Sequence, residues 1–180
     1  MINPEDIVKK YYAEGSKAYG ILFTHSCSVA EKALQIARMH PEWAIDTDFV
    51  YESAMLHDIG IFRTSAPEIY CFGEYPYICH GYLGADLLRA EGLERHALVC
   101  ERHVGAGLTK EEIVKNGFLI PARNMLPETL EEKMVCFADK FYSKSHLGRE
   151  KPVEKIRKSM SKHGEDILFR LDEMIKLFLG

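Results

Sequence analysis

Apolar positions along the chain recur at helical spacing in almost every segment, and the period-two alternation typical of a half-buried strand is scarce. In the segment 20–39, for example, Leu22, Val29 and Ile36 fall on one face of a helix. His25 lies at the flank of this apolar stripe, so we expect its imidazole to face inward. The pattern predicts an all-α fold.

Polar caps and glycines predict where the helices begin and end. Asn3 before Pro4 suits the start of the first helix, and Thr109 with Glu112 forms the sequence of a capping box. We expect Gly60 to end the third helix by adopting the left-handed conformation. The predicted helices cover about 4–13, 20–39, 46–60, 80–90, 93–103, a short stretch from 109, 128–145, and two segments within 152–179 that meet near Gly164.

Residues 61–79 are the longest stretch without a helical pattern, because Pro67, Gly73 and Pro76 interrupt it. Many of the other residues there are aromatic, which favours an ordered loop. The aromatic stretch from Ile69 to Tyr82 either fills the core or covers the base or sugar of a ligand, and the sequence leaves both alternatives open.

The composition is that of one globular domain, with 180 residues, 47% apolar and 28% charged residues. The net charge is −4 and no basic block stands out, so we expect no nucleic-acid polymer as a partner. No apolar run approaches the roughly 20 residues that span a bilayer, and the first residues do not resemble a signal peptide, so the expected location is cytoplasmic with no membrane contact. The five cysteines form no C-x-x-C pair and are expected to be reduced thiols.

The stretch AMLHDIGIF places His57 and Asp58 side by side among apolar residues. An unpaired buried polar group costs about 1–3 kcal/mol, so both side chains need partners. Asp139 lies in the second half of the predicted helix 128–145, which is apolar on every side, so it is also expected to be buried. A metal ion is the simplest common partner, because imidazole and carboxylate groups on separate helices can converge on it. The residues of this type are His25, His57, Asp58, His80, His103 and Asp139.

These residues resemble the HD superfamily of metal-dependent phosphohydrolases. The resemblance covers about residues 20–145 and rests on His25, on His57-Asp58 within HDIG, and on Asp139 within FADK, in the order H…HD…D. His80 and His103 match the additional histidines of the dinuclear branch. The resemblance implies a compact single-domain helical bundle over residues 1–180, with an HD core at about 20–145 and a C-terminal helical extension at about 152–179.

The resemblance also implies how the metals are held. His25, His57, Asp58 and Asp139 would bind the first ion, and Asp58, His80 and His103 the second. Nitrogen and oxygen ligands without thiolate suit Fe, Mn, Zn, Co or Ni. We expect two divalent ions, one in each ligand group. The nucleophile would be a hydroxide that bridges the metals, which makes His57 and Asp58 catalytic as well as metal-binding.

Two cations are candidates for contact with a bound phosphate group. Arg63 follows the HDIG turn and Lys140 follows Asp139, although a structural or solvated role is an equal alternative for each. The other four histidines lie in polar surroundings and are expected at the surface. They are His40, His96, His146 and His163.

We therefore expect a metal-dependent phosphohydrolase that acts on a small phosphoester or phosphoanhydride, in particular a nucleotide. Two alternatives remain, an HD-type di-iron oxygenase and a non-catalytic metal-binding regulatory protein. The expected partner is a small phosphorylated molecule, and a homodimer is compatible with the sequence.

Overall fold

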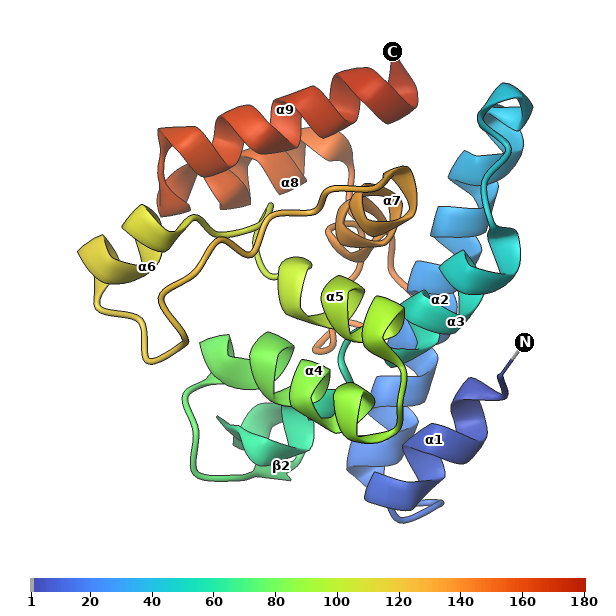
Figure 1. The fold of residues 1–180 in the computed structure, drawn as a ribbon, viewed down its shortest axis with the longest axis vertical. Coiled ribbons are helices and arrows are strands. Elements are labelled where there is room, and N and C mark those ends of the chain that lie inside the picture. The colour runs from blue at the N-terminus through green and yellow to red at the C-terminus, as the bar shows by residue number, and fades with distance from the viewer. Residues whose placement is uncertain (1) are drawn as a thin grey trace.

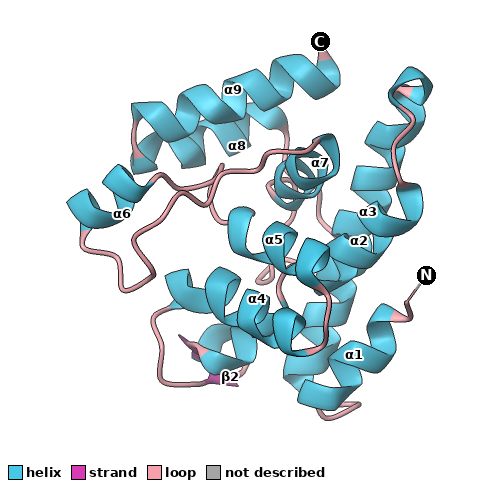
Figure 2. Ribbon diagram, viewed as in Figure 1, coloured by secondary structure: helices cyan, strands magenta, loops and turns pink. Residues whose placement is uncertain are grey.

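The computed structural model describes residues 2–180, which form nine α-helices and one very small sheet, so the predicted all-α fold is confirmed (Figure 1, Figure 2). The strands β1 (Ser65–Ala66) and β2 (Cys71–Phe72) pair antiparallel. The helices are α1 (Pro4–Tyr11), α2 (Lys17–Met39), α3 (Thr47–Leu56), α4 (His80–Ala90), α5 (Glu94–Arg102), α6 (Lys110–Asn116), α7 (Leu130–Asp139), α8 (Val153–Met160) and α9 (Glu165–Leu179).

The long helix α2 packs against α3 and α7, and α4 packs against α5. Figure 1 shows α8 and α9 together at one end of the molecule and α4 with β2 at the other. Two clusters of buried apolar side chains fill the interior. The larger includes Val29, Phe137 and Phe178, whereas the smaller includes Leu22 and Leu88. The helices that carry the predicted ligands therefore converge between two apolar cores.

Several predicted caps are present. The Asn3 side chain accepts a hydrogen bond at the start of α1, Asp46 does the same for α3, and Thr109 with Glu112 forms a complete capping box at α6. The second helix begins earlier than expected, because Ser16 caps it and Gly20 lies within it. Helix α4 has the predicted bounds.

The expectation for Gly60 is wrong. Helix α3 ends at Leu56, and Gly60 lies within a 3-10 helix at Ile59–Arg63 with negative φ. A glycine is needed here for space instead of for conformation. A Cβ at this position would lie 2.3 Å from the carbonyl oxygen of His80 and 2.5 Å from the backbone nitrogen of Gly84. This close approach lets the HDIG segment pack directly onto α4.

Helix α7 is shorter than predicted and ends at Asp139 instead of near residue 145. The backbone N–H groups of Lys140, Phe141 and Tyr142 donate to carbonyls three residues back, which tightens the chain into a turn. The N–H of Lys151 then donates to the Phe141 carbonyl at 2.8 Å and closes the loop 142–150 at its base. This loop returns towards the ligands instead of leaving them along a helix axis.

The segment 61–79 is irregular, as predicted, and consists of the strands β1 and β2 with short 3-10 helices. The five cysteines form no disulfide within residues 2–180, and all except Cys27 are buried. In the same residues, no helix combines the length and the apolar character that crossing a membrane requires.

The Gly60 contact predicts a specific loss of stability. Gly60→Ala places a methyl group against backbone atoms of α4, and such overpacking costs about 1–3 kcal/mol or more. Gly20→Ala is the matched control, because no atom lies within 4 Å of the added methyl group and alanine favours a helix by roughly 1 kcal/mol. Urea denaturation should show a lower midpoint for Gly60→Ala and an unchanged or higher one for Gly20→Ala. Equal stability of the two variants would contradict this explanation.

Candidate metal centre

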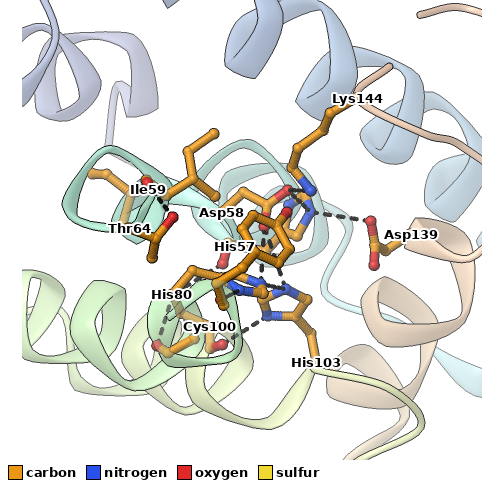
Figure 3. A network of polar contacts seen from close by, with 12 residues as sticks. His57, Asp58, Ile59, Thr64, His80, Cys100, His103, Asp139 and Lys144 are labelled. Carbon is orange, nitrogen blue, oxygen red and sulfur yellow. Dashed lines mark hydrogen bonds and ion pairs between the residues drawn. The ribbon is translucent and has the colours of Figure 1, made fainter. Parts of the chain in front are cut away.

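The six predicted ligands lie together in two groups that share Asp58. One group contains His25, His57, Asp58 and Asp139, and the other contains Asp58, His80 and His103. Within each group the donor atoms all lie within 4.8 Å of one another. His25 comes from α2. The other donors, which Figure 3 labels, lie at or directly beyond helix ends. The convergence that the sequence predicts is therefore present in the structure.

The carboxylate of Asp58 is completely buried, and its two oxygens face different groups. Oδ2 lies 3.2 Å from His25 Nε2 and 3.1 Å from His57 Nε2. Oδ1 lies 3.4 Å from Nε2 of both His80 and His103. A carboxylate in this position has the geometry of a bridge, with one oxygen available to each of two cations.

Three of the histidines are oriented by the same backbone contact. The Nδ1–H of each ring donates to the carbonyl three residues earlier, where the last turn of a helix leaves a carbonyl available. Because a carbonyl only accepts, Nδ1 carries a proton, and Nε2 is the nitrogen that faces Asp58 and is placed to bind a metal. The pairs are His57 with Ala54 at 2.6 Å, His80 with Tyr77 at 2.6 Å and His103 with Cys100 at 2.7 Å.

The resulting arrangement fits divalent cations. His80 Nε2 lies 3.1 Å from His103 Nε2, so two lone pairs face each other. Burial lowers the pKa of His80 to about 3 and also lowers that of His103, which keeps both rings neutral as metal ligands must be. His57 Nε2 and Asp58 Oδ1 are buried without a hydrogen-bond partner, and Asp58 Oδ2 has the ammonium of Lys144 beside it. A cation bound between the donors would give His57 Nε2 and Asp58 Oδ1 a partner.

The acids of the site attract positive charge strongly. Burial opposes ionisation of His57, but the carboxylates of Asp58 and Asp139 raise its pKa to about 9. Burial likewise opposes ionisation of Asp58, whereas His57 and Lys144 hold the pKa of this carboxyl well below its usual range. A bound cation would take the place of the proton that these acids hold on His57. The centre therefore offers carboxylate oxygens and imidazole nitrogens, which is a donor set for a first-row divalent metal.

The sequence did not reveal Lys144, which the structure places at the centre. Its ammonium lies 2.5 Å from Asp58 Oδ2. Burial alone would lower the pKa of Lys144, but the carboxylates of Asp58 and Asp139 hold this pKa above the usual value for a lysine. In a helix continued to residue 145, as predicted, Lys144 would point away from Asp139, because five residues rotate a side chain to another face. The turn after Asp139 brings it back to the site.

The two predicted phosphate contacts have different outcomes. Lys140 Nζ donates to Asp139 Oδ2 at 2.8 Å and to the His103 carbonyl at 3.1 Å, so this lysine lies beside the ligands. The structure does not bring Arg63 to the same place. Its guanidinium lies 5.5 Å from the ring centre of Tyr75, and Arg63 is not among the residues that line the cavity described next.

A cavity of about 790 Å³ opens from the ligands. Its lining includes His80, His103 and Asp139. Tyr77, an aromatic residue of the stretch 69–82, also lines it. The cationic side chains that line it are Lys140, Lys144, Lys151 and Lys162, with His163 beside them. Three carboxylates, those of Glu68, Glu112 and Asp139, also line the cavity, so the four lysines exceed them by one charge. The second donor group therefore borders a space with a small excess of positive charge that is large enough for a small organic ligand.

Cys100 lies directly beside the donors but belongs to neither group. Its thiol donates to the carbonyl of His57 at 2.9 Å, and burial raises the pKa of Cys100 well above the usual value. The same sulfur leaves no room for a side chain at position 84 of α4, since a Cβ at Gly84 would lie 2.6 Å from it. Cys100 thus acts as a neutral packing group and hydrogen-bond donor.

The expectation for the remaining histidines is partly wrong. His96 is buried and its Nε2 lies 2.9 Å from Glu52, a partner far away in the sequence. His40 is half-buried against the carbonyl of Phe178. His146 and His163 are exposed, as predicted.

The family model described as "HD domain" matches residues 22–143. This chain belongs to the HD domain family. The match spans about two thirds of the chain and contains all six donors, from His25 to Asp139. HD family membership and the buried donors together support a metal-dependent hydrolase of this family.

The curated relatives that match this HD protein include two named enzymes and one uncharacterized protein. An uncharacterized protein of Methanocaldococcus jannaschii is 35% identical over 79% of this chain and 79% of its own length. A protein of Thermoplasma volcanium named tRNA (cytidine(56)-2′-O)-methyltransferase is 33% identical over 97% of this chain, and one of the same name from Picrophilus torridus is 32% identical over 74%. This chain spans only 46% and 35% of the length of these two proteins. No solved structure matches at a significant level.

The two donor groups predict two metal equivalents. Chelator-treated protein titrated with Mn²⁺ or Zn²⁺ should bind up to two ions per chain, and His103→Ala should bind one, because it removes a donor of only one group. His96→Gln is the matched control, since His96 is also buried but contacts Glu52 instead of the cluster. Elemental analysis and calorimetry measure the stoichiometry, and circular dichroism confirms the fold. Loss of the same number of ions in both variants would refute the assignment of His103.

Proposed function

We propose that this protein is a metal-dependent phosphohydrolase whose substrate is a small phosphoester or phosphoanhydride, in particular a nucleotide. The observation that carries the proposal is the position of the donor groups at a cavity lined by lysines. Ammonium groups bind phosphate oxygens as point charges, and the metal donors lie where a phosphate bound by these lysines would meet them. A cavity lined by lysines favours an anionic substrate over a neutral one.

Divalent cations bound by the two groups would supply Lewis acidity, which makes water a better nucleophile and offsets negative charge on a phosphoryl oxygen. The protein contributes the orientation of the donors. His80 and His103 present unprotonated Nε2 atoms because their Nδ1 protons are used by the backbone. Lys140 and Lys144 are half-buried beside the acids, so their ammonium groups are positioned to donate to phosphate oxygens. Such a reaction requires no serine or cysteine nucleophile.

The names of two relatives extend the class of substrates to be tested. Both are named for methyl transfer to a cytidine of tRNA, and this chain spans less than half of each. A nucleotide is therefore compatible with the relatives as well as with the cavity. We expect a free nucleotide as the substrate, and a phosphate at the end of an RNA chain belongs in the same panel.

Activity assays test the reaction class. With Mn²⁺, Fe²⁺ or Zn²⁺, the protein should release phosphate from members of a panel of nucleoside monophosphates, dinucleoside polyphosphates and aryl phosphates, without oxygen. Chelation should abolish the release and added metal should restore it, because the donors are essential. The expected loss in Asp58→Asn is at least about a hundredfold. No phosphate release, combined with oxygen consumption in the iron-loaded protein, would contradict hydrolysis and favour a di-iron oxygenase.

A comparison of two variants tests which cation binds the phosphate. Lys144→Gln should lower kcat/KM by about tenfold to a hundredfold, because a charged hydrogen bond contributes roughly 1.5–3 kcal/mol. Arg63→Ala should have a smaller effect, since Arg63 lies against Tyr75 outside the cavity lining. Metal content is measured on both variants, so that loss of metal is separated from loss of phosphate binding. A larger loss in Arg63→Ala would instead assign the phosphate contact to Arg63, as the sequence predicts.

A further inference from the structure

The C-terminal segment lies beyond the HD domain match, yet it forms part of the cavity wall. The loop 142–150 leads into α8, and Figure 1 shows α8 and α9 together beside α7. This segment is fixed to the family core. Arg170 of α9 donates to the carbonyl of Gly107 at 3.0 Å and to the carboxylate of Glu112 at 2.8 Å. Side chains that the segment directs into the cavity are therefore held in place.

Lys151 is half-buried at this wall. It differs from the lysines near it in its ion pairing. Lys140 pairs with Asp139 and Lys144 pairs with Asp58. Lys32 pairs with Glu150, the residue directly before Lys151. Within residues 2–180, by contrast, the ammonium of Lys151 has neither an ion-pair partner nor a hydrogen-bond acceptor. Lys151 lines the same cavity as Lys140 and Lys144.

The charges around Lys151 favour binding of an anion. Burial lowers the pKa of Lys151, and the ammonium groups of Lys140, Lys144 and Lys155 lower it further, whereas Asp139 acts in the opposite direction. A half-buried cation among other cations is destabilised by desolvation and by repulsion. An anionic group in the cavity would relieve both effects at once. Lys162 adds another ammonium to the lining from the exposed 3-10 turn Ser161–His163.

We propose that Lys151, assisted by Lys162, binds a second phosphate group of the substrate, separate from the phosphate at the metal donors. This inference rests on the proposed function and narrows its substrate to a nucleotide with two phosphate groups. The apolar part of the lining supports the nucleotide part, because Phe118, Ile156 and Met160 offer apolar surface to a nucleoside. Lys151 is thus a specificity-determining residue, and Lys140 and Lys144 remain with the phosphate that reacts.

Binding to chelator-treated protein tests the inference without catalysis. Calorimetry compares adenosine 3′,5′-bisphosphate and ADP with AMP, and repeats the set with another base. Wild-type protein should bind at least one of the two-phosphate ligands about tenfold or more tightly than the monophosphate, and Lys151→Gln should abolish this preference while it leaves the affinity for the monophosphate within about twofold. Lys162→Gln should reduce the preference in part.

Lys158→Gln is the matched control, since Lys158 is an exposed lysine of α8 that does not line the cavity. It should retain the full preference. A short RNA that ends in a phosphate distinguishes the source of the second group, because tighter binding of the RNA than of the free bisphosphate would assign it to the neighbouring phosphodiester of a chain.

Equal affinity of the wild-type protein for one and two phosphates would overturn the inference, as would an equal loss for both ligand classes in Lys151→Gln. Failure of the proposed function gives a different result, in which the Lys151-dependent preference persists in binding but no ligand is hydrolysed by the metal-loaded protein.

Discussion

The ionised carboxylate of Asp58, which has no exposed surface, is the constraint on which the site depends. Removing such a charge from water costs several kcal/mol unless other groups compensate for it. The chain compensates with the ammonium of Lys144 and with His57, whose raised pKa of about 9 allows its ring to carry a proton. The Nε2 atoms of His25, His80 and His103 surround the same two oxygens, where a bound cation would lie between nitrogen and oxygen. These groups come from α2, the end of α3, the start of α4, the end of α5 and the loop after α7, so the packing of the helices and the neutralisation of one charge are the same structural problem.

Helix ends solve much of this problem. An end leaves carbonyl groups without partners, and His57, His80 and His103 use these carbonyls to fix both the tautomer and the direction of their rings. The donors are thereby oriented by the backbone, whose position follows from the packing of whole helices. The two glycines Gly60 and Gly84 contribute in the same way, because they have no side chain and let the HDIG segment pack closely against α4. Side-chain chemistry here is determined by main-chain geometry.

The helical fold and the six donors could be predicted from the sequence, because both follow from local patterns: apolar periodicity, and polar residues in apolar surroundings. What the sequence did not reveal depends on distant contacts. His96 looked exposed because its partner Glu52 lies in another helix, and Gly60 looked like a helix terminator because its neighbours on α4 are distant in sequence. Lys144 was missed because the end of α7 depends on turns that no strong breaker residue marks. In each case the tertiary contact outweighed the local signal.

Cys100 has a consequence for metal selection. A thiolate so close to the centre would favour soft ions such as Cu⁺ over the first-row divalent ions that imidazole and carboxylate groups prefer. The fold prevents this by burial, which keeps the thiol protonated, and by directing its hydrogen to the carbonyl of His57. A sulfur atom therefore contributes to the packing of the centre without offering itself as a ligand, so the donors remain nitrogen and oxygen although a cysteine lies beside them.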